Sequence, residues 1–375
     1  MELSLSRLVI YFLRLGAMGF GGPFALVASM KADLVDKLGW FTEQEYEEGF
    51  AFSQAAPGPI APQLAMYLAY LRYGVRGSTL VVVAFIFAPL VLVLVLSHLY
   101  VQYGRMGWIQ SVLFGITPAV VALITHAAWK LGRGMLKDLR GWIIAAASFA
   151  LMTFWHVEIS LIIIGAGLLG LLATLYRNPA QLAALVSPLL LFQAGVQTLD
   201  ASQEPLFLKL ALFFFKAGAL TFGSGYVVVA FLQQGVVDNY HWLTLQQFFD
   251  GVAIGQVTPG PVVITAAFVG YLTEGLPGAL ISMSCVLLPI YLITIVASPF
   301  VRKLRANRFL QGFISSANAA ALGTIASVAV TMATGTVTNW LSALVVVGAL
   351  AALLAWNVPS ILIILAAGAI GFVVQ

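Results

Sequence analysis

Phe12-Leu-Arg14-Leu-Gly16-Ala-Met-Gly-Phe20-Gly21-Gly22-Pro23 returns 202 positions later as Phe214-Phe-Lys216-Ala-Gly218-Ala-Leu-Thr-Phe222-Gly223-Ser224-Gly225. At the same offset, Gln54-Ala-Ala-Pro57-Gly58-Pro59 returns as Gln256-Val-Thr258-Pro259-Gly260-Pro261. Nineteen positions between Leu8 and Pro59 are identical to their counterparts, and the alignment needs no gap. The chain therefore consists of two repeats that arose by duplication, and it has preserved glycines, prolines and a cation within apolar segments.

The composition indicates a membrane protein. Apolar residues make up 61% of the 375-residue chain and charged residues 9%, and the mean hydropathy is +1.00, which excludes a soluble globular class. Apolar stretches at 80–99, 109–129, 159–175 and 279–301 are long enough for helices that cross roughly 30 Å of hydrocarbon. Strand-like alternation is absent, so the sequence predicts an all-α polytopic protein whose partner is the lipid bilayer. Its cations lie in short loops, where they orient helices, and we expect no nucleic-acid partner.

The repeats divide the chain into residues 1–177, a linker at 178–205 and residues 206–375. Each repeat is predicted to begin with two long helices broken by glycine and proline, at 5–35 and 42–71 and at 206–237 and 244–272. The second helix of each pair starts with a capping box, formed by Thr42 with Glu45 and by Thr244 with Gln247. Four ordinary spans follow in each repeat.

Loop charge predicts that the two repeats cross the membrane in opposite directions. The loops at 72–76 and 130–140 are basic, whereas their counterparts at 273–277 and 331–339 contain no lysine or arginine; residues 302–308 of the second repeat carry four cations where the first has only Arg105. The positive-inside rule then gives an inverted-topology repeat. Inversion requires an odd crossing between the repeats, which 179–196 could supply, for about thirteen crossings with the N-terminus cytoplasmic and the C-terminus periplasmic or extracellular. Re-entrant hairpins in place of the broken helices would preserve the same parity.

Arg14 and Lys216 occupy equivalent positions within apolar runs. A cation near the middle of a lipid-facing helix costs on the order of 3 kcal/mol, so such residues normally face a protein interior or a wet cavity. The alternative is that each side chain snorkels to the membrane surface. Because the cation occurs in both repeats, we expect Arg14 and Lys216 to bind substrate.

The glycines and prolines beside these cations break the helices. Proline suits the first turn of a new helix, so each break is expected to begin a half-helix whose positive dipole end and free N–H groups point into the membrane. Such ends bind anions, and inverted symmetry would bring four of them to one midplane site. Close helix packing through small residues is the competing explanation for the glycines. The residues expected to line the site are Gly21, Gly22, Pro57, Gly58, Pro59, Gly223, Pro259, Gly260 and Pro261.

Neutral polar side chains flank the breaks and could donate to substrate oxygen atoms. They are Ser53, Gln54, Thr221, Ser224, Gln256 and Thr258. Thr117 and Asn318, which are also equivalent, lie in mid-span and could contact either substrate or another helix.

Two equivalent carboxylates, Glu48 and Asp250, could carry a coupling proton if they are buried. Glu48 lies in an acidic run typical of a solvated helix end, so Asp250 is the stronger candidate. The four histidines form no ligand-spaced pair, the single Cys285 excludes a cysteine cluster, and no nucleotide-binding loop occurs. We therefore expect no metal and no cofactor.

The motif Phe-x-Arg/Lys-x-Gly-x-x-x-Phe-Gly-Gly/Ser, followed by Gln-x-x-Pro-Gly-Pro in each half, resembles the chromate ion transporter family of the long two-domain type. The resemblance spans the whole chain. It implies export of chromate across the inner membrane of a bacterium or archaeon, driven by ion gradients, with Arg14, Lys216, the paired glutamines and the break residues at the site. Lys216, Ser224 and Gly225 depart from the first repeat's Arg14, Gly22 and Pro23, which argues against a strictly symmetric site.

The sequence thus predicts a secondary active transporter for a tetrahedral dianionic oxyanion, chromate first, which would confer chromate resistance. A sulfate or other small-anion transporter and an anion channel of the same fold are the alternatives. An intramembrane enzyme would need a catalytic dyad or metal triad that the scattered histidines and single cysteine do not provide. Glycine-rich faces would permit a homodimer.

Overall fold

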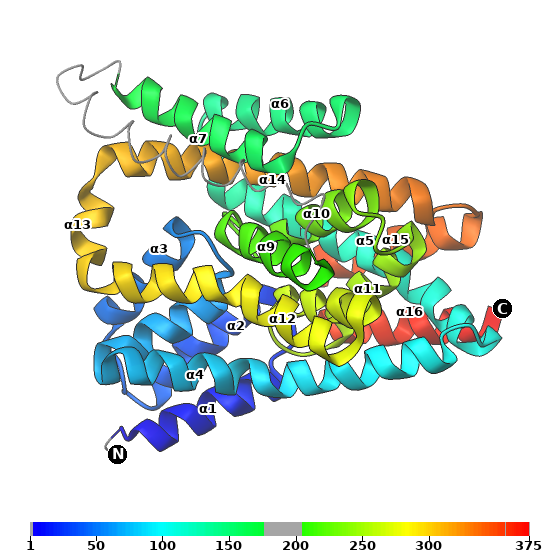
Figure 1. Cartoon of the computed structure of the whole chain (residues 1–375), viewed down its shortest axis with the longest axis horizontal. Coiled ribbons are helices and arrows are strands. Elements are labelled where there is room, and N and C mark those ends of the chain that lie inside the picture. Colours follow the sequence, from blue (N-terminus) through cyan, green and yellow to red (C-terminus); the bar gives the residue numbers. More distant parts are fainter. Residues whose placement is uncertain (1–2, 176–204, 357, 375) are drawn as a thin grey trace.

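The computed structural model describes residues 3–175, 205–356 and 358–374, and all regular structure in these ranges is helical (Figure 1). The first repeat contains α1 (Leu5–Met18), α2 (Gly22–Met30), which continues as a π-helix over Lys31–Lys37, α3 (Glu43–Ala55), α4 (Ile60–Tyr103), α5 (Gly107–Met135), α6 (Leu139–Trp155) and α7 (Ile159–Leu175). The second contains α9 (Leu206–Ala219), α10 (Val227–Leu232) with a π-helix over Gln233–Asn239, α11 (Leu245–Val257), α12 (Thr265–Ala297), α13 (Val301–Ala306), α14 (Arg308–Thr336), α15 (Trp340–Ala355) and α16 (Ser360–Val374).

The chain turns back on itself at each glycine or proline break. The Tyr11 hydroxyl of α1 donates to the Asp33 carboxylate at 3.3 Å, although a continuous helix would hold residues 22 positions apart at about 33 Å. In the second repeat, the equivalent Phe213 ring contacts Gly235. Each repeat therefore opens with a helical hairpin.

The second break of each repeat is the tip of another hairpin. The Tyr67 ring of α4 lies against Gly49 of α3, and the Phe268 ring of α12 lies against Gly251 of α11. Both capping boxes at the starts of these hairpins are present, which confirms that part of the sequence analysis.

These hairpins differ from the long broken helices expected at 5–35, 42–71, 206–237 and 244–272. Arms of 13 or 14 residues, as in α3 and α1, extend only about 20 Å, less than the hydrocarbon core. The positive φ angles at the tips reverse the chain instead of bending it, so the structure favours the re-entrant alternative. The expected crossing at 179–196 lies outside the described residues.

A second reversal lies within α4, at Gly74 (φ 57°, ψ −147°). The Ser78 hydroxyl donates to the Met66 carbonyl at 2.7 Å, whereas twelve residues of straight helix would separate them by about 18 Å. Gly275 makes the equivalent turn in α12. After these turns the long arms of α4 and α12 pack against each other and run in opposite directions (Figure 1).

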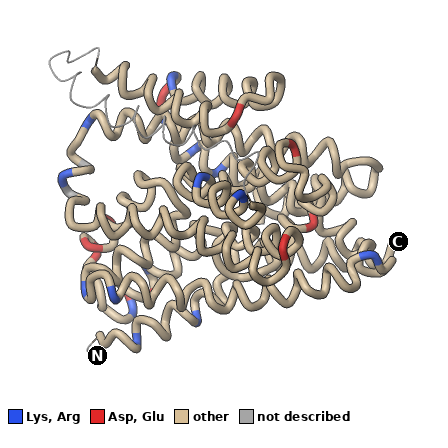
Figure 2. The backbone as a smooth tube through the Cα atoms, in the orientation of Figure 1, with Lys and Arg blue, Asp and Glu red and all other residues tan. Residues whose placement is uncertain are grey.

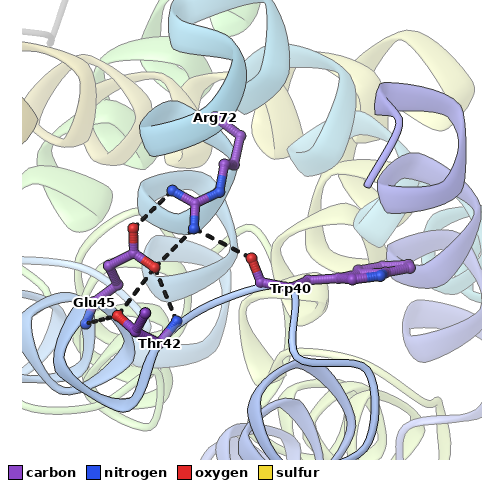
Figure 3. A network of polar contacts seen from close by, with 4 residues as sticks. All are labelled: Trp40, Thr42, Glu45 and Arg72. Carbon is purple, nitrogen blue, oxygen red and sulfur yellow. Dashed lines mark hydrogen bonds and ion pairs between the residues drawn. The ribbon is translucent and has the colours of Figure 1, made fainter. Parts of the chain in front are cut away.

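Within the residues that the structure describes, four stretches of helix are long and apolar enough to cross a membrane: Ile60–Tyr103, Gly107–Met135, Val262–Phe300 and Arg308–Thr336. The helices α6, α7, α15 and α16 are shorter apolar helices. Charged positions are sparse along the packed helices, as Figure 2 shows. Polar contacts lie at the end of a hairpin opposite its tip. There Arg72 donates to both Glu45 carboxylate oxygens and to the Trp40 carbonyl (Figure 3).

The two repeats exchange helices. The first repeat's α5 packs against α15 and α16 of the second repeat, and the second repeat's α14 packs against α6 and α7 of the first. Glycines permit the close approach, since a Cβ atom on Gly115 would clash with the Ala367 carbonyl and one on Gly170 with the Gly312 carbonyl. The described helices of the two sequence repeats are thus interlocked in space.

Candidate functional site

Each hairpin tip is followed by the start of a helix. Gly21, at φ 104°, is the N-cap of α2, and Pro23 lies in its first turn. Pro59 is the N-cap of α4, and Tyr226 that of α10. New helices therefore begin at these breaks, as expected, although Pro261 is followed first by a 3-10 helix over Val262–Ile264. The first-turn N–H groups of an α-helix have no partner within that helix and lie at its positive dipole end.

The four tips meet in two reciprocal pairs. The Gly58 N–H donates to the Thr221 carbonyl at 2.5 Å, and the Gly260 N–H donates to the Gly19 carbonyl at 2.9 Å. Gly58 is equivalent to Gly260, and Gly19 to Thr221, so each repeat makes the same contact with the other. This exchange is what a two-fold relation between the repeats requires.

A cavity of about 390 Å³ opens between the first tips of the two repeats and is called the tip cavity below. Its walls come from α2, α5, the loop before α10, and the junction of α15 with α16. The residues that line it are Phe20, Gly21, Pro23, Phe24, Ala25, Leu123, His126, Ala127, Lys130, Leu131, Ser224, Tyr226, Leu353, Val358, Pro359 and Ser360.

The tip cavity is cationic. Lys130 lies one helical turn beyond His126 on α5, and its ammonium group is 5.9 Å from the centre of the Phe24 ring. The N-terminus of α2 adds the partial positive charge of its dipole. Ser224 and Tyr226 contribute hydroxyl groups, and no carboxylate is among the described residues of the lining. Such a cavity can bind a small anion.

Several hydroxyls expected to face substrate are bound within their own helices. Ser53 donates to the Gly49 carbonyl at 2.7 Å, Thr221 to Ala217 at 2.6 Å and Thr258 to Gly255 at 2.9 Å. Thr117 likewise donates to Leu113 at 2.9 Å. These hydroxyl protons are therefore already donated to backbone carbonyls three or four residues earlier in the chain, as short polar side chains readily do.

The amide side chains near the tips behave differently. Asn318 of α14 donates to the Gln54 carbonyl at 3.3 Å and so ties the second repeat to a tip of the first. Its side-chain oxygen and the Gln256 side-chain nitrogen are buried without a hydrogen-bond partner among the described residues.

Arg14 and Lys216 do not converge. Arg14 is exposed on α1 and lines neither the tip cavity nor the cavity that contains Lys216. The Lys216 ammonium group forms an ion pair with Glu158, which precedes α7 of the first repeat. Each cation lies six residues, about 9 Å of helix, before its tip, and the two side chains line no common cavity among the described residues.

The two candidate coupling carboxylates have unequal environments. Asp250 is fully buried and accepts hydrogen bonds from the Tyr100 hydroxyl at 2.6 Å and from the Gln246 amide at 2.9 Å. Glu48 is half-buried and accepts from the equivalent Gln44 amide at 3.2 Å. Only Asp250 is enclosed between the repeats, since Tyr100 belongs to α4 and Asp250 to α11.

Comparison with known proteins assigns the chain to a family. The profile of the chromate transporter family matches residues 6–171 and again residues 208–372, which also confirms the two repeats. The chain belongs to the chromate transporter family. It is a multi-pass membrane protein and a transporter, not an enzyme.

Full-length relatives carry the same description. The chain is 40% identical over 359 residues to the chromate transport protein of Cupriavidus metallidurans, which covers 94% of this chain and 88% of that protein. It is 40% identical over 335 residues to the probable chromate transport protein of Synechococcus elongatus, covering 88% and 84%. It is 29% identical over 388 residues to the chromate transport protein of Pseudomonas aeruginosa, covering 99% and 93%. No solved structure is significantly similar to it.

Three lining residues of the tip cavity were not predicted as site residues. The sequence analysis placed Lys130 in a basic loop and gave no role to His126 or Tyr226. The structure continues α5 to Met135 and thereby carries Lys130 to the wall of the tip cavity. The four-residue spacing of His126 and Lys130 was the available signal, because it places both on one helix face.

Proposed function

We propose that this protein is a secondary active transporter that exports chromate, a tetrahedral dianionic oxyanion, across the inner membrane and so confers chromate resistance. Two relatives at 40% identity that are named for chromate transport support the choice of substrate. The observation that carries the proposal is the cationic tip cavity between the first tips of the two repeats.

The proposed binding chemistry uses side chains and backbone together. The Lys130 ammonium group neutralises part of the substrate charge, and the free N–H groups at the start of α2, including that of Gly22, donate to its oxygen atoms. The Tyr226 and Ser224 hydroxyls donate from the second repeat. A lysine is a point charge that does not fix the orientation of a tetrahedral anion, so the directional donors define the position of the oxygens.

The remaining break residues form the frame of this site. Pro57, Gly58 and Pro59, and Pro259, Gly260 and Pro261, hold the second tips against the first through the reciprocal hydrogen bonds. Gly223 leaves room for Asn318, whose oxygen would lie 3.4 Å from an added Cβ atom. The antiparallel course of α4 and α12 supports an inverted-topology repeat, in which the tip cavity would open alternately to the two sides of the membrane.

Asp250 is the proposed proton-coupling residue. Burial of a carboxylate with only neutral donors is costly, so a proton taken up at Asp250 would relieve an uncompensated charge. Its hydrogen-bond partner Tyr100 belongs to the first repeat. Protonation of Asp250 would therefore alter a contact between the two repeats.

The substrate assignment is tested by transport into everted membrane vesicles. Lys130→Gln should raise the chromate KM about tenfold, because one charge-assisted hydrogen bond contributes roughly 1.5–3 kcal/mol. Lys137→Gln is the matched control, since Lys137 is exposed, as Lys130 is, but lies outside the lining of the tip cavity. An unchanged KM in Lys130→Gln vesicles would reject the tip cavity as the site.

Two further measurements separate the alternatives. Sulfate that competes with chromate more strongly than chromate competes with itself would identify a sulfate transporter. Flux that fails to saturate and ignores an imposed pH gradient would identify a channel.

A further inference from the structure

A second cavity, of about 250 Å³, lies beside α9 and is called the Lys216 cavity below. Its polar lining consists of Lys216, Glu158, Gln234, Asn239 and Tyr240, and the rest is apolar and aromatic. It has no residue in common with the tip cavity.

Glu158 behaves in this cavity as a bound anion would. Its Oε1 atom accepts from the Lys216 ammonium group and from the Ser160 hydroxyl, the latter at 3.1 Å. The side chains of Lys216 and Glu158 are 30% and 40% exposed, so the pair lies at the mouth of a cavity and is not packed into a core. The carboxylate thus occupies the position from which an external oxyanion would meet Lys216.

The second repeat has no such carboxylate at the equivalent position. Aligning Trp155 with Trp356 places Pro359 at the position of Glu158. Pro359 lines the tip cavity, where no carboxylate is present in the described lining. The two cavities therefore differ in their internal charge: the described lining at the start of α16 has no carboxylate, whereas Glu158 supplies one at the start of α7.

We propose that the Lys216 cavity is a second binding site for small oxyanions, in which Glu158 is a built-in competing anion. When the carboxylate is displaced or its charge is removed, Lys216, whose side chain is 30% exposed, is left with no other anion in the described lining. A partly desolvated cation in that situation attracts an external anion that can enter through the mouth of the cavity. The Ser160 hydroxyl and the polar side chains of the cavity supply further hydrogen bonds.

The test measures binding of labelled sulfate to the full-length protein in lipid nanodiscs. The Lys130→Gln background removes the proposed tip-cavity site, and Glu158→Gln is then added to it. The expected result is that Glu158→Gln creates a saturable site at least tenfold tighter than any in Lys130→Gln alone, and that Lys216→Gln abolishes this gain. Glu158→Asp, which keeps the carboxylate, should show no gain.

Either of two results overturns the proposal: no gain in the Glu158→Gln protein, or a gain that survives Lys216→Gln. If Glu158→Gln does not fold, Lys216→Gln alone decides the question. In that variant the unpaired Glu158 carboxylate is partly exposed to solvent, so the protein is expected to fold. The unmodified protein should then show a weak second phase of sulfate binding that Lys216→Gln removes, and persistence of that phase would reject the site. If sulfate binding is unchanged by Lys130→Gln, that result counts against the tip-cavity site and not against the Lys216 cavity.

Discussion

The Gly58 N–H donates to the Thr221 carbonyl, and this contact between the repeats is repeated by Gly260 and Gly19. Both donors have positive φ angles, 135° at Gly58 and 94° at Gly260, which residues other than glycine seldom adopt. The tips of the four hairpins are therefore held together by two backbone hydrogen bonds that only glycine can place.

Gly58→Ala and Gly260→Ala should each impair chromate transport and lower thermal stability, by about 1–3 kcal/mol from backbone strain alone. The added Cβ atom would also lie 2.9 Å from Ile290 at Gly58 and 2.7 Å from Pro89 at Gly260. Gly134→Ala is the control, because an added Cβ meets nothing within 4 Å there. Transport assays and melting curves in detergent check the prediction, and near-native behaviour of both variants would contradict it.

Gly16 and Gly218 bring the first arm of each repeat against the long arm that follows. A Cβ atom on Gly16 would clash with the Phe85 carbonyl, and one on Gly218 with the Val286 carbonyl. We expect Gly16→Ala and Gly218→Ala to reduce stability by about 1–3 kcal/mol through overpacking. Gly165→Ala, with open space at its Cβ position, should leave the melting temperature unchanged. Equal melting temperatures for all three variants would refute the close approach.

Asp250→Asn should abolish the dependence of chromate flux on an imposed pH gradient while leaving chromate binding in place, because the amide cannot exchange a proton. Tyr100→Phe removes one of the two hydrogen bonds to Asp250 and should weaken the dependence without abolishing it. Glu48→Gln is the control from the equivalent position. A pH-gradient response that survives in Asp250→Asn would assign coupling to another residue.

Glu45 should make stability depend on pH in the acidic range. Hydrogen bonding to Arg72 holds the pKa of Glu45 below its ordinary value, despite an opposing effect of burial. A depressed pKa in the folded state gives stability that is present above the unfolded pKa, near 4.3, and is lost as the pH falls through the folded value. Glu45→Gln should therefore lower stability at pH 7 by about 1 kcal/mol and flatten its loss between pH 5 and pH 3.

The comparison for this prediction is Glu43→Gln, which breaks the more exposed pair with Lys31. Melting temperatures measured from pH 7 to pH 3 should separate the two variants. A steeper acid transition in Glu45→Gln than in the unmodified protein would show that the sign is wrong.

The duplication and its local signals could be read from sequence because each depends on short-range chemistry. Thr42 and Glu45 lie three residues apart and form the expected capping box, and Pro23 starts a helix as expected. Whether Gly21 bends a helix or reverses it depends on contacts such as that between Tyr11 and Asp33, which are made across the hairpin. Sequence spacing along one helix is a poor guide to such contacts.

The same limit applies to the candidate site. Arg14 and Lys216 were chosen because a cation in an apolar run is energetically costly unless it faces substrate or water. In the structure, Lys216 offsets this cost by pairing with Glu158 from the other repeat. Lys130 near the end of α5 carried no such cost, and only its four-residue spacing from His126 indicated a shared helix face. Its place in the tip cavity arises from packing of α5 against helices about 200 positions later in the chain.

The exchange of helices between the repeats also bears on how the chain is made. When α5 has been synthesised, its packing surface for α15 and α16 has no occupant until more than 200 further residues have been added. Contacts so distant in sequence close slowly. The glycine-lined grooves of the first repeat are therefore in contact with lipid until the last two helices insert. Insertion of these helices completes the walls of both the tip cavity and the first repeat.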